Sequence, residues 1–245
     1  MSFLFDERFS DSPYVERIYR TNNESTESFL SVAASHWEMV ITNFQGQTTC
    51  TVRGPETKVT PLECPPGGEF LGIRFKVGVV MPHLPASNLV DDDLTLPEAS
   101  KQAFWLQGSA WQFPDFENAD TFVEWLVRAN LLVRDPVVEA CWQDQPSNLS
   151  LRTCQRRFLR ATGLTYQRAR QIERARYATT LLRQGIPIQD VVFEAGYYDQ
   201  PHLHHAMQQL IGQTPTQIMN MDKQLSFLYK TTTFPCGIIP SHFNR

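Results

Sequence analysis

The chain has 245 residues, of which 42% are hydrophobic, and a formal net charge of −4. This length allows a sizeable buried core in one large domain or two modest ones. No stretch approaches the roughly 18 to 20 apolar residues that span a membrane, and no basic segment leads into an apolar run at the N-terminus. We therefore expect a cytoplasmic protein without a membrane partner.

The charge is unevenly distributed along the chain. Residues 1–135 carry 10 Lys and Arg against 19 Asp and Glu, whereas residues 150–185 carry nine Arg against Glu173 alone. On charge alone, a solvated helix face is the ordinary interpretation of such a segment. The use of Arg rather than Lys shifts the balance toward nucleic acid, because the guanidinium fork fits phosphates and guanine edges.

The cysteines are odd in number, scattered, and contain no C-x-x-C pair. We expect reduced thiols that pack as small apolar residues, with no cofactor and no metal. These residues are Cys50, Cys64, Cys141, Cys154 and Cys236.

The acidic first part of the chain is predicted to be β structure. The run at 29–41 leads through a Gln-Gly turn into the alternating residues 48–53, which predicts a hairpin, and residues 70–77 predict another strand. Residues 82–97 are rich in Pro, Asp, Asn and Ser and predict a surface loop. The Asp triplet at 91–93 suits a helix start or a solvated turn better than a cation site, because no Gly-turned loop or distal Glu follows it.

Helical periodicity begins near Asp120 and ends at the break formed by Asp135 and Pro136, where we place a domain boundary. Such an apolar stripe belongs to a core or pairs with a second copy of the chain. Its members are Phe122, Trp125, Leu126 and Ala129.

The basic segment predicts a first helix at 150–163. Ser150 is its expected N-cap, Cys154 and Phe158 lie on its buried face, and Gly163 is its expected end. The outward side then carries side chains of the types that bind base edges or phosphates in a major groove. They are Ser150, Arg152, Gln155 and Arg156.

A long connecting helix is predicted from Thr165 to about Gln184, with Gly185 as its stop. Its apolar positions are Ile172, Ala175, Thr179 and Leu182. Arg168, Arg170 and Arg174 either contact phosphates from its sides or form a plain solvated face.

A helix-turn-helix pattern follows. Pro187 opens one helix, Gly196 supplies the turn, and Asp199 caps a second helix with Leu203 and Met207 on its inner face. The outer side carries Gln200, Pro201, His202, His204 and His205. Groove or phosphate contact, or else a plain surface position, suits these imidazoles better than a metal site, because no Cys or carboxylate lies beside them in sequence to complete one.

These motifs resemble the DNA-binding domain of AraC/XylS transcriptional regulators over residues 136–220. The segments that carry the resemblance are LSLRTCQRRF at 149–158, ATG at 161–163, ARYATTLL at 175–182, GYYDQPHL at 196–203 and GQTP at 212–215. The resemblance implies two helix-turn-helix units joined by a linker helix, each placing its second helix in a major groove of operator DNA. The first would use Ser150, Arg152, Gln155 and Arg156, and the second Gln200, Pro201, His202, His204 and His205.

The sequence departs from the family pattern at two places. Only residues 136–149 precede the first recognition helix, where the family fits two helices, so we expect its docking to be weaker or altered. His205 stands where the family usually has Arg. Because imidazole changes its charge near neutral pH, we expect weaker and more pH-sensitive DNA contact there.

The predicted fold class is α+β and multidomain. A β-rich, cupin-like sensor or dimerisation domain at 1–118 precedes a connecting helix at 119–135, a double helix-turn-helix domain at 136–221 and a tail at 222–245. The resemblance implies a small-molecule effector, RNA polymerase and a second copy of the chain as further partners. The alternative is a small-molecule-binding or metal-dependent cupin-like protein with a degenerate DNA-binding domain. Because His36 and His83 stand alone, we do not expect an enzyme.

Overall fold

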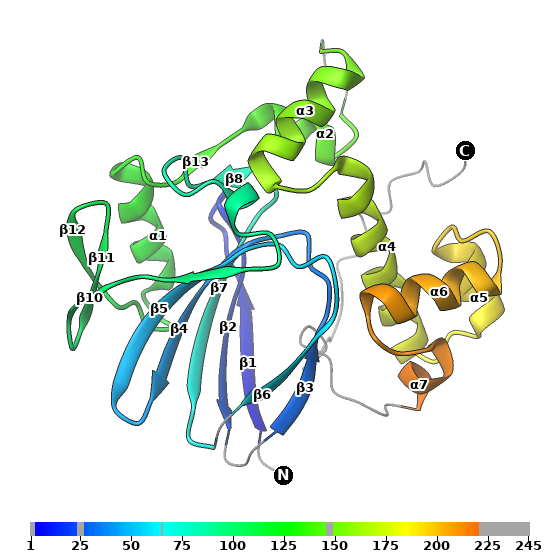
Figure 1. The fold of residues 1–245 in the computed structure, drawn as a ribbon, viewed down its shortest axis with the longest axis horizontal. Coiled ribbons are helices and arrows are strands. Elements are labelled where there is room, and N and C mark those ends of the chain that lie inside the picture. Colours follow the sequence, from blue (N-terminus) through cyan, green and yellow to red (C-terminus); the bar gives the residue numbers. More distant parts are fainter. Residues whose placement is uncertain (1–2, 24–26, 65, 146–148, 221–245) are drawn as a thin grey trace. The chain divides into compact units, whose positions relative to one another are not determined.

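The computed structural model describes residues 3–23, 27–64, 66–145 and 149–220, so the predicted tail at 222–245 lies outside the described residues. Within them, a β-rich region precedes a helical region that contains the helix-turn-helix pattern (Figure 1). The predicted α+β class is therefore confirmed. No helix in the described part of the chain is long and apolar enough to cross a membrane.

The chain forms two compact units that do not follow chain order. The first unit contains Met1–Glu27, His36–Pro55 and Cys64–Thr165, and the second contains Ser28–Ser35, Glu56–Glu63 and Tyr166–Arg245. The division of the chain at residues 118, 135 and 221 stays a prediction.

A six-stranded antiparallel sheet forms the base of the first unit, in the order β1-β2-β7-β4-β5-β9. Its strands are β1 (Phe3–Phe9), β2 (Val15–Asn23), β4 (Glu38–Phe44), β5 (Gln47–Arg53), β7 (Glu69–Phe75) and β9 (Asp93–Thr95). The predicted hairpin is β4 and β5, which turn at Gln45 and Gly46 and place Ile41 opposite Cys50. The strand predicted at 70–77 is β7.

Two predictions for this region need correction. The run at 29–41 is two strands, β3 (Glu27–Ser31) and β4, because β3 pairs with β6 (Thr60–Cys64) rather than continuing into the large sheet. The predicted loop at 82–97 contains a 3-10 turn, η1 (Ala86–Asn88), and the edge strand β9, whose Leu94 pairs with Val52. The Asp triplet is thus a turn that enters a strand, not a helix start.

The remaining strands form two small sheets. One has the order β10-β11-β12 and the other pairs β8 with β13. Their bounds are β8 (Val79–Val80), β10 (Glu98–Ser100), β11 (Ala103–Leu106), β12 (Ser109–Gln112) and β13 (Val133–Arg134).

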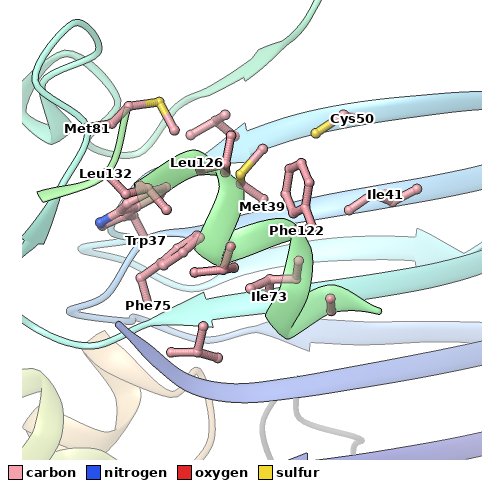
Figure 2. Close-up of a cluster of buried hydrophobic side chains, with 14 of the residues drawn as sticks. Trp37, Met39, Ile41, Cys50, Ile73, Phe75, Met81, Phe122, Leu126 and Leu132 are labelled. Carbon is pink, nitrogen blue, oxygen red and sulfur yellow. The ribbon is translucent and has the colours of Figure 1, made fainter. Parts of the chain in front are cut away.

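The core of the first unit lies between the large sheet and α1 (Ala119–Arg128), and Figure 2 shows side chains from both. Phe122 and Leu126 are buried there beside Met39, whereas Trp125 is 50% exposed. The predicted stripe is therefore partly wrong, because the buried face of α1 is rotated toward Ala119, Phe122, Val123 and Leu126.

The helical region contains α2 (Pro136–Trp142), α3 (Leu151–Thr162), α4 (Tyr166–Arg183), α5 (Ile188–Glu194), α6 (Gln200–Leu210) and α7 (Pro215–Met219). Its local signals behave as predicted. Asp135 caps α2 by accepting from the backbone N–H groups of Val137 and Val138, which explains the break there. The predicted apolar positions of the connecting helix, now α4, are all fully buried.

Candidate DNA interface

In the first helix-turn-helix unit, α2 holds the inner face of α3. Phe158 is fully buried and stacks on Trp142 with ring centroids 5.6 Å apart, while Arg157 pairs with the Asp135 carboxylate at 2.9 Å. The ends of α3 are fixed as predicted, since the Ser150 hydroxyl accepts from Thr153 N at 3.3 Å and Gly163 terminates the helix at a φ of 76°. These contacts leave the opposite face of α3 at the surface.

The outward face of α3 presents the predicted residues together. Ser150, Arg152, Gln155 and Arg156 are all exposed. Within the described part of the chain, neither Arg152 nor Arg156 has an ion-pair or hydrogen-bond partner. Two permanent cations and an amide are therefore available to a ligand on one helix face.

The structure adds two residues to this face that the sequence reasoning left out. Arg160 is exposed and continues the row of Arg152 and Arg156 at intervals of four residues, about 6 Å apart along the helix axis. Leu159 lies one turn beyond Gln155 and is 45% exposed. The spacing of the arginines was the available signal for Arg160, whereas the exposure of a leucine has no signal in the sequence.

In the second unit, α6 packs its inner face against α4. Leu203, Met207 and Leu210 are buried, and the Met207 sulfur lies 3.9 Å from the Thr179 hydroxyl of α4. The Asp199 carboxylate caps α6 by accepting from His202 N at 2.8 Å. Figure 1 shows α5, α6 and α7 beside one end of α4.

The outer side of α6 is polar but carries no permanent charge. The predicted residues Gln200, Pro201, His202, His204 and His205 are all exposed. An open depression on this side of α6 is lined by Gln200, Pro201, His204, His205 and Gln208. Gln208 and Gln209 are exposed as well and were not predicted as site residues. Among the described residues, no group of three or more His, Cys, Asp or Glu could hold a metal ion.

His202 differs from the other two histidines because it faces the turn before α6. Its Nδ1 accepts from Tyr198 N at 3.4 Å, and its ring meets the Tyr197 ring edge-on at 5.2 Å. Burial raises the pKa of Tyr197 to about 12, although the nearby Arg174 guanidinium opposes this shift. His202 thus contributes to the turn as well as to the surface.

Arginines of α4 form hydrogen bonds within the second compact unit. Arg168 donates to the backbone oxygen of Thr57 at 2.6 Å, and Arg170 donates to the Tyr166 hydroxyl. Arg174 donates to the oxygen of Gly196 and stacks over Tyr197. Neither predicted interpretation, phosphate contact or a plain solvated face, included these bonds to protein atoms, which give the three arginines a structural role.

The two helix-turn-helix units therefore differ in charge. Residues 184–220 contain Asp190, Glu194 and Asp199 but neither Lys nor Arg, whereas α3 alone carries four arginines. Exposed positive charge is therefore concentrated on α3, whereas the outer side of α6 carries no Lys or Arg.

Comparison with known proteins identifies the helical region. Residues 146–221 match the family model of a helix-turn-helix domain. A solved structure of ToxT from Vibrio cholerae is similar over 89% of this chain and 98% of that chain, with 9% sequence identity and a TM-score of 0.37. No curated protein matches the chain in sequence. Residues 146–221 thus contain a helix-turn-helix domain.

Proposed function

We propose that this chain is a sequence-specific regulator of transcription that binds double-stranded operator DNA through α3 and α6. The observation that carries the proposal is the outward face of α3, where Arg152, Gln155 and Arg156 are exposed together within a helix-turn-helix domain. A major groove admits one helix, and the second helix of each unit is the element that enters it.

The side chains of α3 match distinct features of the groove. Arg152 and Arg156 can each donate two hydrogen bonds to a guanine edge, and Gln155 can pair with adenine. The exposed Leu159 offers an apolar contact for a thymine methyl group, and Arg160, farther along the helix, is placed for a phosphate. The first unit would therefore supply both specificity and electrostatic attraction.

The side chains of α6 would supply specificity with little attraction. Gln200 and Pro201 occupy its first turn, the part of a recognition helix that contacts base edges. His204 and His205 lie beside them at the open depression. A neutral imidazole can donate one hydrogen bond and accept another but adds no charge, so the second helix-turn-helix unit would depend on the first for phosphate binding.

Three finer predictions belong to this proposal. A small-molecule effector would act through the β-rich region, two copies of the chain would bind one operator, and RNA polymerase would be the downstream partner. They follow from the resemblance stated for the sequence.

The experiment is selection of full-length protein against random-sequence duplex DNA across a salt series. We expect an enriched motif with two half-sites about one helical turn apart and a steep loss of affinity with salt. Arg152→Ala and Arg156→Ala should each weaken binding to that motif. Arg128→Ala removes an exposed arginine from α1 and is the matched control. An absence of enrichment, or equal affinity for all three variants and the unmodified chain, would refute the proposal.

A further inference from the structure

The glycine that ends each recognition helix lies against a segment of the β-rich region. Gly163 follows α3 and Gly212 follows α6, and both have a φ of 76°. That conformation is strained for other residues, so glycine is expected at both positions as a helix end. Neighbouring residues also lie so close to both glycines that a Cβ atom would collide with them.

At Gly163 the neighbouring segment is η1 and the residues after it. A Cβ atom on Gly163 would lie 2.6 Å from the Val90 side chain, 2.9 Å from the Ser87 Cα and 3.1 Å from the Ala86 oxygen. The segment is itself tied to the end of β5, because Gly54 N donates to Asp92 O at 3.1 Å and Asp91 N donates to Pro55 O at 2.9 Å. The end of α3 is therefore packed on a fixed part of the first unit.

At Gly212 the neighbouring segments are the two that β3 and β6 contribute to the second unit. A Cβ on Gly212 would lie 3.0 Å from one Val59 methyl group and 3.3 Å from the Leu30 side chain. We call residues 28–35 and 56–63 the ribbon. Ala34 and Glu56 exchange backbone hydrogen bonds of 2.8 and 2.9 Å between its two halves.

The ribbon is also bonded to the helices of the second unit at several points. Ala33 N donates to the oxygen of Leu210, the last residue of α6, at 2.9 Å, and Ala33 O accepts from Arg176 of α4 at 3.2 Å. The Ser35 hydroxyl donates to the Glu173 carboxylate at 2.6 Å. Ala33 is fully buried. Because both backbone groups of a buried residue are satisfied by helices, the ribbon is an integral part of this unit.

We infer that the β-rich region positions both recognition helices, by docking η1 at the end of α3 and the ribbon at the end of α6. Each helix has its own docking point in a different compact unit. A change in the β-rich region that moves the ribbon acts on α6, and one that moves η1 acts on α3. The consequence for DNA rests on the function proposed above, but the docking itself does not.

The test uses hydrogen exchange of the full-length protein and one matched control. Gly212→Ala introduces both backbone strain and a collision with the ribbon. Gly185→Ala, just after α4 in the same unit, introduces the strain alone, because Gly185 has a φ of 80° and no neighbour within 4 Å of its Cβ position. We expect Gly212→Ala to speed exchange in α6 and in the ribbon together by roughly tenfold more than Gly185→Ala does. Gly163→Ala should act likewise on α3 and residues 86–90.

A second variant keeps the inference testable if Gly212→Ala does not fold. Val59→Ala removes the methyl groups that the new Cβ would meet, so the double variant Gly212→Ala, Val59→Ala should recover folding and part of the lost protection. Unchanged ribbon exchange in Gly212→Ala, or no recovery in the double variant, would overturn the inference. If exchange responds as expected but the unmodified protein binds no DNA, the docking stands and the proposed function fails.

Discussion

The two helix-turn-helix units share one architecture but differ in the chemistry of their outer faces. On α3, Arg152, Arg156 and Arg160 form a row of exposed cations. On α6, the exposed residues are glutamines, histidines and one proline, and residues 184–220 contain acidic side chains but neither Lys nor Arg. A shared scaffold therefore does not imply a shared role, because scaffold and surface charge come from different residues.

The comparison also shows how a short unit can still hold its recognition helix. Only seven residues form α2, yet the stack of Trp142 on Phe158 and the ion pair of Asp135 with Arg157 fix it to α3. Weaker docking of the first unit stays a prediction. Its charge nevertheless favours DNA more than that of the second unit.

The largest expected effect is the loss of arginine contacts on α3. Arg152→Ala and Arg156→Ala should each cost about 1 to 3 kcal/mol of binding to the selected operator, because a bidentate base contact is lost. His204→Ala and His205→Ala, measured at pH 8, should each cost less. Titration of labelled operator with each variant checks this order. Equal losses on the two helices would remove the distinction between the units.

A smaller effect concerns the salt dependence of binding. Arg160→Ala should reduce the slope of log affinity against log salt by about 0.9, the value for one phosphate contact. Arg170→Ala removes the same charge from α4, where it is bonded to the Tyr166 hydroxyl, and should leave the slope unchanged. If both variants reduced the slope alike, the arginines of α4 would belong to the DNA interface after all.

Sequence patterns predicted the helical region better than the β-rich one. Its helix ends depend on neighbouring residues, such as Ser150, Gly163 and Asp199, so they are visible locally. The separation of β3 from β4 and the pairing of β9 with β5 depend on partners far along the chain, which periodicity does not reveal. For the same reason the sequence showed the arginines of α4 but not their partners, Thr57 among them.

A further effect concerns charge on the second helix-turn-helix unit. His205 is exposed at the open depression on α6, and residues 184–220 contain neither Lys nor Arg. One exposed charge contact corresponds to about 0.2 to 1 kcal/mol, or roughly a 1.4- to fivefold change in affinity. His205→Arg should therefore raise affinity for the selected operator by that factor, whereas His205→Gln, which adds no charge, should not. Equal affinity of the two variants would count against a phosphate contact at this position.

The smallest effect separates the two helix-turn-helix units by a cysteine thiol and a tyrosine hydroxyl whose pKa values are raised. In the first unit, burial and a hydrogen bond with Cys154 raise the pKa of the Cys141 thiol to about 12. A raised pKa means that the unfolded chain, with an ordinary thiol pKa near 9, loses its proton first. The contribution of this thiol to the free energy of unfolding should therefore be fully present below pH 9 and be lost progressively as pH rises toward 12.

In the second helix-turn-helix unit the corresponding group is Tyr197, whose pKa rises from 10 to about 12. Its contribution to the free energy of unfolding should therefore begin to be lost about one pH unit higher. Thermal unfolding of the full chain between pH 8 and 10 measures the first part of this range. Burial also raises the pKa of the Cys50 thiol to about 12, so Cys141→Ala should lessen the fall in that range without abolishing it, and Tyr197→Phe should leave it unchanged. The same fall in both variants and the unmodified chain would mean that other groups govern alkaline stability. Such a result would also mean that Cys141 and Cys154 contribute little to the hold of α2 on α3. That hold would then rest on the stack of Trp142 and Phe158, whose side chains do not titrate.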